Sequence, residues 1–444
     1  MSIPKGRRRG RVGNVSFYFH HGSWWLYFRE NGKPVRQKVS VERDEAEKVV
    51  AQINGQLAAA APTLLSFSPI SISELRQQFL GYHENVLKSS MMTVSRYRAA
   101  TQHLETFAKS QGASCPAHAI GACAFAAYLR AVEVAPNGHP NALRRKLRDK
   151  GVQFILAACR SMYAFAAKRR HLPPYSENPF AELPLDRFKI EDAKPIFVFD
   201  AQTELAFLEA ADDWTFAIHF LLAKTGLRVG EAVHLLVDEL DLEARWLRVR
   251  NKPALGWRVK TGTERDVPLL SEVVAVLRQT IGIRSTGPVF LRHRFIKDGL
   301  PLLNGPQREL ERECEKRQRS SATPLTRSQI AKVCRSVWRD CGAVKADVIR
   351  TNFIRVMSAL GHPEATCPKS WRHSFATLLQ DANVDPLIRQ ITLGHRPSTG
   401  VGLGMTGNYT HTRPETQRAQ IEAALRMWPQ SLTLASAKFG KETL

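Results

Sequence analysis

The residues most able to do chemistry lie in short segments of the second half of this sequence. Arg228 lies in TGLRVGE, Arg372 in WRHSFAT, His395 in LGHR and Tyr409 in NYTH. An arginine guanidinium stays protonated at any working pH and offers a rigid fork of N–H donors. That fork suits the non-bridging oxygens of a phosphate, which gain negative charge when a nucleophile attacks. The segments therefore indicate chemistry on a phosphate.

The overall charge indicates which kind of phosphate. Lys and Arg total 64 against 41 Asp and Glu, a formal net charge of +23 over 444 residues. An excess of this size favours a polyanionic partner, because each cation that neutralises a nucleic-acid phosphate releases a condensed counterion. Nucleic acid is the predicted partner, and a basic protein that binds none is the alternative from charge alone.

The second half must fold so that these segments meet. The sequence predicts a helix that stops at Gly226 and a second helix that carries Arg228 in its first turn. Strands are predicted at 245–250 and 257–260, followed by a third run at 266–270, which places Lys260 near a hairpin turn. Residues 297–328 read as a charged insertion. An amphipathic helix over 414–428 has Ile421, Leu425 and Trp428 on one face, and this spacing does not say whether the face covers its own core or contacts a partner.

The first half predicts two smaller modules. Residues 1–11 form a basic arm, and three β-rich runs at 15–20, 24–30 and 35–41 precede a helix at 44–57. Helical patterns follow at 72–87, 93–110, 120–132 and 143–170, with a basic face near the end of the last. The arm and this face supply the predicted DNA contacts, which otherwise are solvated charges: Arg7, Arg8, Arg9, Arg11, Arg160, Lys168, Arg169 and Arg170.

These patterns predict a multidomain protein. Its parts are a basic arm and β-rich module (1–57), a linker (58–71), an α-helical domain (72–180), a second linker (181–198), a mainly α domain with a small antiparallel β-sheet (199–428) and a C-terminal tail (429–444). The seven cysteines are irregularly spaced, which argues against a disulfide framework or a zinc ribbon. No apolar run approaches the length of a membrane span, so we expect a cytoplasmic protein.

Five motifs in order give the sequence a family resemblance. TGLRVGE, KTGTERDVPL, RHSFAT, LGH and YTH resemble the motif set of the tyrosine recombinases of the phage integrase family, over roughly residues 199–425. Each motif alone is short enough to recur by chance, whereas five in order are specific. The resemblance implies that the helical module is a core-binding domain of the SAM-like type. The β-rich module is similar to the arm-binding domain of some integrases, with a structural or protein-binding appendage as the alternative.

The resemblance also implies a role for each motif residue. Tyr409 would be the nucleophile that forms a 3′-phosphotyrosyl bond, Arg228 and Arg372 would clamp the phosphate, and Lys260 would give a proton to the leaving 5′-oxygen. His395 would donate a hydrogen bond to the same phosphate. These groups need no cofactor. Each motif residue also has a structural alternative when it is taken alone. These are an ion pair of Arg228 with Glu231, a solvated Lys260, a helix-capping His395 and a half-buried Tyr409.

The sequence departs from the family in two places. The family has His three residues before the second arginine, where this chain has Lys369, for which we predict a hydrogen bond to the phosphate or to Tyr409. The stretch between His395 and Tyr409 contains four glycines and is longer than usual.

The implied function is site-specific recombination, in which a homotetramer on two double-stranded DNA sites integrates or excises a mobile element. A catalytically impaired DNA-binding accessory protein is the alternative, and a relaxing topoisomerase is a more distant one.

Overall fold

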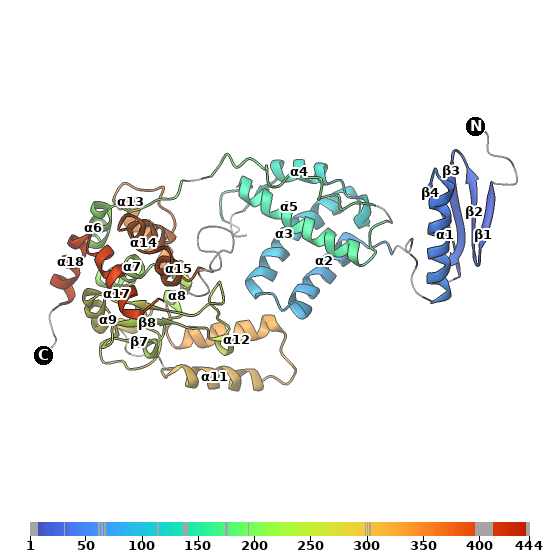
Figure 1. Ribbon diagram of the computed structural model, residues 1–444. Helices are drawn as coiled ribbons and strands as arrows, with labels where there is room; N and C mark the ends of the chain where they lie inside the picture. The colour runs from blue at the N-terminus through green and yellow to red at the C-terminus, as the bar shows by residue number, and fades with distance from the viewer. Residues whose placement is uncertain are drawn as a thin grey trace. The chain divides into compact units, whose positions relative to one another are not determined.

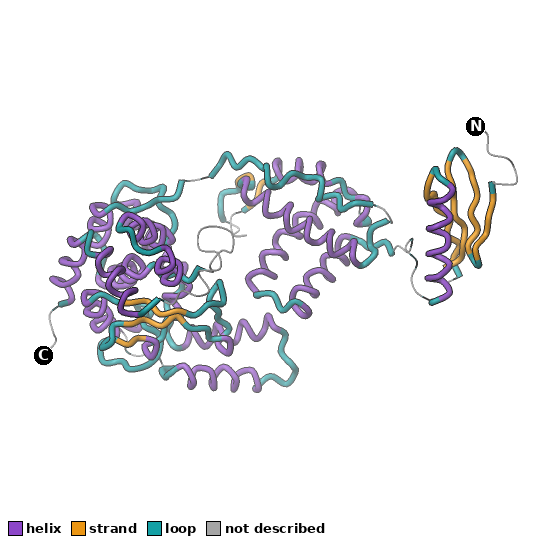
Figure 2. The backbone as a smooth tube through the Cα atoms, in the orientation of Figure 1, coloured by secondary structure: helices purple, strands orange, loops and turns teal. Residues whose placement is uncertain are grey.

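The chain folds into two compact units, residues 1–193 and 194–444, in a computed structural model (Figure 1). The structure describes residues 8–30, 32–60, 63, 65, 68–112, 115–135, 141–173, 176–193, 195–297, 299, 301, 303–395 and 412–440. Helices dominate both units, and the strands form small sheets (Figure 2). The predicted fold class is confirmed.

The first unit begins with a small sheet covered by one helix. Strands β1 (Arg9–Val12), β2 (Val15–His20), β3 (Ser23–Glu30) and β4 (Lys33–Ser40) pair antiparallel in that order. Alternation along β2 and β3 turns Val15, Phe17, Leu26 and Phe28 into a core. Helix α1 (Arg43–Ala58) closes this core on one face of the sheet (Figure 1).

The sheet differs from the predicted three-stranded one, since it has four strands among the described residues. Strand β1 comes from the segment that the sequence predicted as a basic arm. Val12 and Val15 face each other across a tight turn, which Gly13 permits at a φ of 55°. The prediction of a basic arm over residues 1–11 did not take this Gly-Asn turn into account.

The helical module of the first unit contains α2 (Ile72–Gly81), a π-helical turn (Tyr82–Val86), α3 (Met91–Gln111), a 3-10 turn (Ala117–Ala119), α4 (Ala122–Ala131), β5 (Glu133–Val134), β6 (Arg145–Lys146) and α5 (Asp149–Lys168). The four predicted helices are present, but the last begins at Asp149 instead of residue 143, because Arg145 and Lys146 pair with β5. Leu185 lies in the same core, so the module extends beyond residue 180, where the sequence placed its end.

The second unit contains α6 (Ala201–Glu209), α7 (Asp213–Thr225), α8 (Val229–Val233), a 3-10 turn (Val237–Glu239), β7 (Leu240–Asp241), β8 (Trp246–Val249), a 3-10 turn (Pro253–Leu255), β9 (Arg265–Pro268), α9 (Ser271–Ile281), α10 (Arg294–Lys297), α11 (Gln307–Arg319), α12 (Arg327–Asp340), α13 (Ala346–Ala359), α14 (Lys369–Asp381), α15 (Pro386–Leu393), α17 (Pro414–Leu425) and α18 (Pro429–Phe439). Strands β7, β8 and β9 form an antiparallel sheet in that order. The predicted strand at 257–260 is a loop in the structure, apart from a bridge between Lys252 and Trp257.

The C-terminal helices belong to the core of the second unit. Ile421 and Leu425 of α17 are fully buried there, so the amphipathic face predicted from the sequence covers its own domain in this structure. Helix α18 occupies the segment predicted as a tail, and Leu432 and Phe439 pack in the same core. The sequence placed the end of the domain at residue 428, before this last apolar stripe.

The predicted insertion at 297–328 contains α11. Helices α11 and α12 pack on each other around a satellite core that includes Leu310, Cys314, Cys334 and Val337. The seven cysteines are free thiols in this structure. None of the described helices has the length and apolar character that crossing a bilayer requires.

Candidate active site

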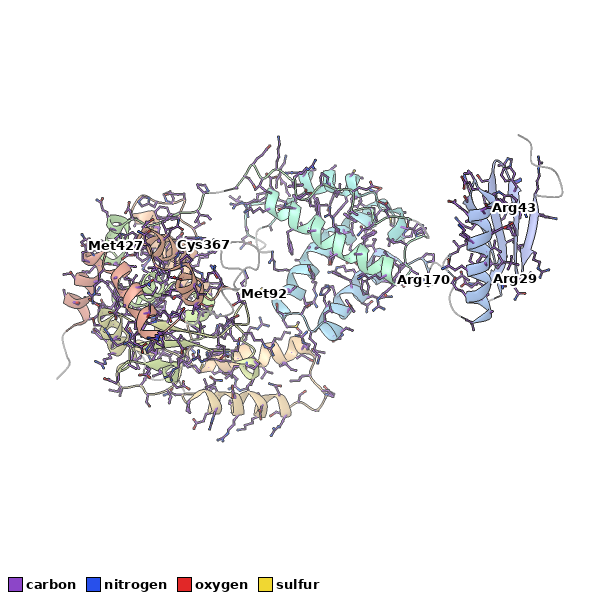
Figure 3. The ribbon with its side chains drawn as sticks, viewed as in Figure 1. Arg29, Arg43, Met92, Arg170, Cys367 and Met427 are labelled. Atoms are coloured by element: carbon purple, nitrogen blue, oxygen red, sulfur yellow. The ribbon has the colours of Figure 1, made fainter. Side chains whose placement is uncertain are left out.

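Helix α14 places Arg372 at the centre of the candidate site. Its neighbour Trp371 is fully buried, stacks on Phe199 at 3.7 Å between ring centroids, and donates from Nε1 to Nδ1 of His219 at 2.9 Å. These contacts fix the orientation of α14. Cys367, labelled in Figure 3, lies just before this helix.

Arg372 joins the ends of two other helices. Its guanidinium donates to the carbonyl of Gly226 at 2.8 Å and to the carbonyl of Leu393 at 2.5 Å. Gly226 ends α7 and Leu393 ends α15, so one side chain connects the TGLR, RHSFAT and LGH segments. Burial, and then the charge of Arg228, lower the pKa of Arg372 to about 10, which leaves it charged at neutral pH.

Arg228 precedes α8 and is held by the carboxylate of Glu231. The Arg228 backbone N–H donates to Oε2 of Glu231, and its Nη1 donates to Oε1, both at 2.9 Å. The ion pair that the sequence offered as a structural alternative is therefore present. It leaves the Arg228 side chain 23% exposed, so the guanidinium still reaches the surface of the site.

Arg265, which the sequence reading gave no role, binds the same carboxylate. Its Nη1 and Nη2 donate to Oε1 and Oε2 of Glu231 at 3.1 and 2.7 Å, and its Nε donates to the carbonyl of Thr392 at 2.8 Å. Burial opposes ionisation of Glu231, but the hydrogen bonds and charge of Arg265, and then those of Arg228, lower its pKa. A buried arginine inside a strand needs such a partner. The R of the KTGTERDVPL segment was the available signal.

His395 follows the left-handed cap Gly394 and faces Arg372. Its Nε2 lies 3.1 Å from Nη2 of Arg372. A guanidinium can only donate, so Nε2 accepts, and a neutral ring then carries its proton on Nδ1. Burial, followed by the charges of Arg372, Arg228 and Arg265, lowers the pKa of His395 and favours this neutral form.

The two lysines of the candidate site lie at the surface. Lys260 sits at a turn in the loop between β8 and β9, and Lys369 is the first residue of α14, three residues before Arg372. Neither ammonium has an ion-pair partner within the described part of the chain. Both charges are therefore available to an anion in the structure as described.

Tyr409 and Arg7 lie outside the described residues. Among the other predicted DNA-contact residues, Arg8, Arg9 and Arg11 are exposed at the start of the β-sheet, and Lys168, Arg169 and Arg170 are exposed at the end of α5. Arg169 lies over the ring of Phe165, while Arg170 donates to the carbonyl of Thr63 (Figure 3). Arg160 differs from expectation, because its guanidinium donates to the carbonyls of Phe180, Ala181 and Leu183.

The fold and the site define the class of this protein. The buried Arg372 contacts His395, and Arg228 is close enough for its charge to lower the pKa of Arg372. Glu231 binds Arg228 and Arg265 in the same mainly helical domain, whose surface also carries the exposed Lys260 and Lys369. Such an arrangement fits an enzyme that stabilises negative charge on a phosphodiester.

Comparison with known proteins identifies the family. Residues 198–416 match the Phage integrase family. The chain belongs to this family of tyrosine recombinases and is a site-specific DNA recombinase.

Solved integrase structures share its architecture. The lambda integrase dimer bound to a COC′ core site is 13% identical, with 88% of this chain and 94% of that chain covered and a TM-score of 0.50, which shows the fold. The Tn1549 transposon integrase in complex with circular intermediate DNA is 19% identical, with 80% and 99% covered and a TM-score of 0.49. The lambda integrase tetramer bound to a Holliday junction is 14% identical, with 90% and 98% covered and a TM-score of 0.48.

Proposed function

We propose that this recombinase cleaves and rejoins DNA through a 3′-phosphotyrosyl intermediate, and that it thereby integrates or excises a mobile element. The observation that carries the proposal is the position of Arg372. Its guanidinium binds the carbonyls of Gly226 and Leu393 and faces His395, so three motif segments meet around one charge. The charge of Arg228 lowers the pKa of Arg372, which supports a position of both guanidinium groups around one anion.

The residues divide the reaction between them. The Tyr409 hydroxyl releases its proton to water as its oxygen bonds to phosphorus, and the bond from phosphorus to the 5′-oxygen breaks while Lys260 gives that oxygen a proton. Arg228 and Arg372 stabilise the charge on the non-bridging oxygens, and His395 adds a hydrogen bond. Attack by a 5′-hydroxyl on the phosphotyrosyl bond reverses the step without ATP, and Lys369 binds the phosphate or the Tyr409 hydroxyl.

The basic surfaces of the first unit support DNA contacts outside the catalytic domain. Arg9 and Arg11 stand on β1, and Arg36 lies over the rings of Tyr18 and Trp25 at 5.3 and 5.4 Å. Guanidinium groups beside aromatic rings suit a nucleic-acid backbone and its bases. We assign this surface, with Arg7, Arg8, Lys168, Arg169 and Arg170, to phosphate binding. Arg160 contributes to the fold instead.

The lambda integrase structures include a tetramer on a Holliday junction. By analogy we propose that four copies of this chain act on two double-stranded sites. Exchange of two strand pairs requires four cleavages, and each tyrosine performs one.

A nicked suicide substrate tests the proposed chemistry. The substrate is a duplex from the end of the protein's own element, nicked so that the short 5′-hydroxyl fragment leaves after cleavage. We expect a covalent adduct linked to the 3′-phosphate, which denaturing electrophoresis resolves, and its loss in Tyr409→Phe. An undiminished adduct in Tyr409→Phe would remove Tyr409 as the nucleophile.

The same assay separates the enzyme from an accessory protein. Two features favour the accessory function: the exposed Lys369 in place of the family's histidine, and the long sequence between His395 and Tyr409. Specific binding of the site without an adduct in the wild-type protein would support that alternative, while relaxation of supercoiled plasmid lacking the site would support a topoisomerase.

A further inference from the structure

The loop that carries Lys260 is closed by a single asparagine. Asn251 lies two residues after the end of β8, and Lys260 lies nine positions farther along the same loop. The Oδ1 of Asn251 accepts from the backbone N–H of Val259 at 2.9 Å, and its Nδ2 donates to the carbonyl of Gly262 at 3.2 Å. One side-chain amide therefore binds the chain on both sides of Lys260.

The turn around Lys260 is itself well defined at these two ends. The N–H of Gly262 donates to the carbonyl of Val259 at 2.8 Å, and Gly262 has a φ of 76°. Val259 is 3% exposed and belongs to the core of the unit. The two hydrogen bonds from Asn251 hold the loop at the same two residues, Val259 and Gly262. They also fix the orientation of the amide, because a flipped amide would set its N–H against the N–H of Val259 and its oxygen against the carbonyl oxygen of Gly262.

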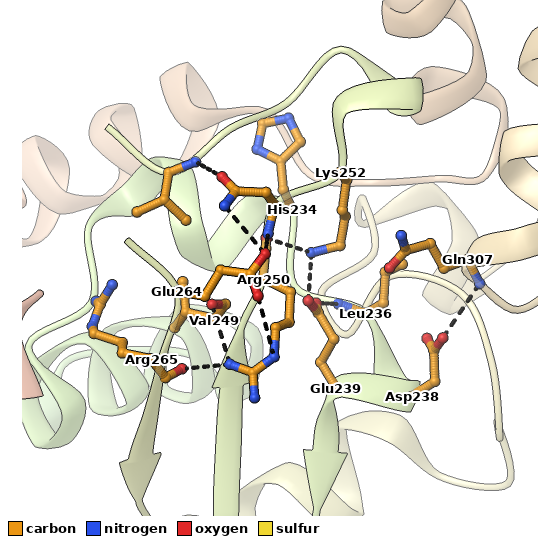
Figure 4. Close-up of polar contacts among 12 residues, drawn as sticks. His234, Leu236, Asp238, Glu239, Val249, Arg250, Lys252, Glu264, Arg265 and Gln307 are labelled. Atoms are coloured by element: carbon orange, nitrogen blue, oxygen red, sulfur yellow. Dashed lines mark hydrogen bonds and ion pairs between the residues drawn. The ribbon is translucent and has the colours of Figure 1, made fainter. Parts of the chain in front are cut away.

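Asn251 is in turn fixed by the base of the loop. Its backbone N–H and its Nδ2 both donate to Oε1 of Glu264, at 2.9 and 3.2 Å. Next to it, Lys252 is 1% exposed and donates to Oε1 of Glu239 at 2.6 Å (Figure 4). Arg250 binds Asp266 at 2.5 Å. A buried ion pair on one side and strand-end contacts on the other leave Asn251 little freedom.

We propose that Asn251 is a positioning residue for Lys260. The inference rests on the proposed role of Lys260 as the donor of a proton to the leaving oxygen. An exposed lysine with a long flexible side chain reaches a reacting atom reliably only if its backbone is held. Asn251 holds that backbone, and its loss increases the range of positions from which the ammonium must find the 5′-oxygen.

The test compares two leaving groups in single-turnover cleavage of the suicide substrate. One substrate has the natural 5′-oxygen at the scissile phosphate, and the other has sulfur there. A thiolate leaves without a proton, so its departure does not depend on a general acid. We expect Asn251→Ala to slow cleavage of the oxygen substrate by about 10-fold to 100-fold and to cleave the sulfur substrate at nearly the wild-type rate.

Three variants make the outcome decisive. Asn352→Ala on α13 is the matched control and should equal the wild type with both substrates. Lys260→Ala tests the proposed function by itself, since failure of sulfur to rescue this variant would refute the general-acid role. If sulfur rescues Lys260→Ala but Asn251→Ala is slowed equally on both substrates, or on neither, the positioning role is overturned. Thermal melting of each full-length variant shows whether a slowed protein is folded.

Discussion

The carboxylate of Glu231 holds Arg228 and Arg265 together, so its substitution should destabilise the site. It accepts four hydrogen bonds, two from Arg228 and two from Arg265, and the Arg265 side chain is only 2% exposed. Glu231→Gln keeps the shape but replaces one acceptor oxygen with a donor that faces the arginines. Two of the four charge-assisted bonds are lost, and a buried guanidinium loses its counter-charge.

The expected cost follows from those contacts. Two charged hydrogen bonds at roughly 1.5–3 kcal/mol each give a loss of about 3–6 kcal/mol. Breaking a buried ion pair by removing one partner costs a similar amount, about 3–5 kcal/mol. We therefore expect Glu231→Gln to lower the free energy of unfolding of the second unit by about 4 kcal/mol, within the range these two principles set.

Urea denaturation of the full chain, followed by tryptophan fluorescence, measures this change. The matched control is Glu243→Gln, because Glu243 also pairs with an arginine, Arg278, but its side chain is 89% exposed. A surface pair of this kind is worth at most about 1 kcal/mol. Equally small losses of unfolding free energy in both variants would refute the claim that the Glu231 carboxylate stabilises the second unit through Arg228 and Arg265.

Three further predictions concern α14 and its surroundings. Burial lowers the pKa of His219 to about 3, whereas in the unfolded chain this histidine takes up a proton near its usual pKa of 6.5. The folded state is therefore destabilised as the pH falls below 6.5, by about 2 kcal/mol at pH 5. Unfolding at pH 7.5 and 5 should show a smaller loss in His219→Gln, which keeps an acceptor for Trp371; an identical loss would contradict this. Gly226→Ala should reduce both stability and cleavage, because a Cβ there would lie 2.4 Å from Phe375 at a φ of 62°; an unchanged melting temperature would contradict it. Lys369→His should preserve or raise the rate of adduct formation, and loss of cleavage would remove the proposed role of Lys369.

The sequence predicted the parts of the site that depend on local pattern. Arg372 was assigned to the candidate site from its segment, RHSFAT. Glycine punctuation predicted the end of α7 at Gly226, which is the left-handed cap of that helix. These features depend on residues within one or two turns of each other, so the sequence contains what determines them.

Other features depend on contacts that sequence spacing does not contain. The bond from Arg265 to Glu231 spans 34 positions, and that from Arg265 to Thr392 spans 127. The segment of β1 was predicted as a basic arm because it is rich in arginine, and its pairing with β2 cannot be seen from its own residues. The segment of α18 was predicted as a tail because its few apolar residues do not by themselves indicate a helix that packs on the core of the second unit.

The glycines of the motif segments have no reactive side chain, but they allow the backbone to approach the arginines and their neighbours closely. Arg372 binds the main-chain carbonyl of Gly226, and a side chain at that position would collide with Phe375 on the helix that carries Arg372. At Gly394 a Cβ would come within 3.0 Å of Arg265, at a φ of 64°. The two glycines therefore set how closely helix ends approach the arginine side chains. A motif of this kind specifies distances between backbone segments as much as it specifies reactive groups.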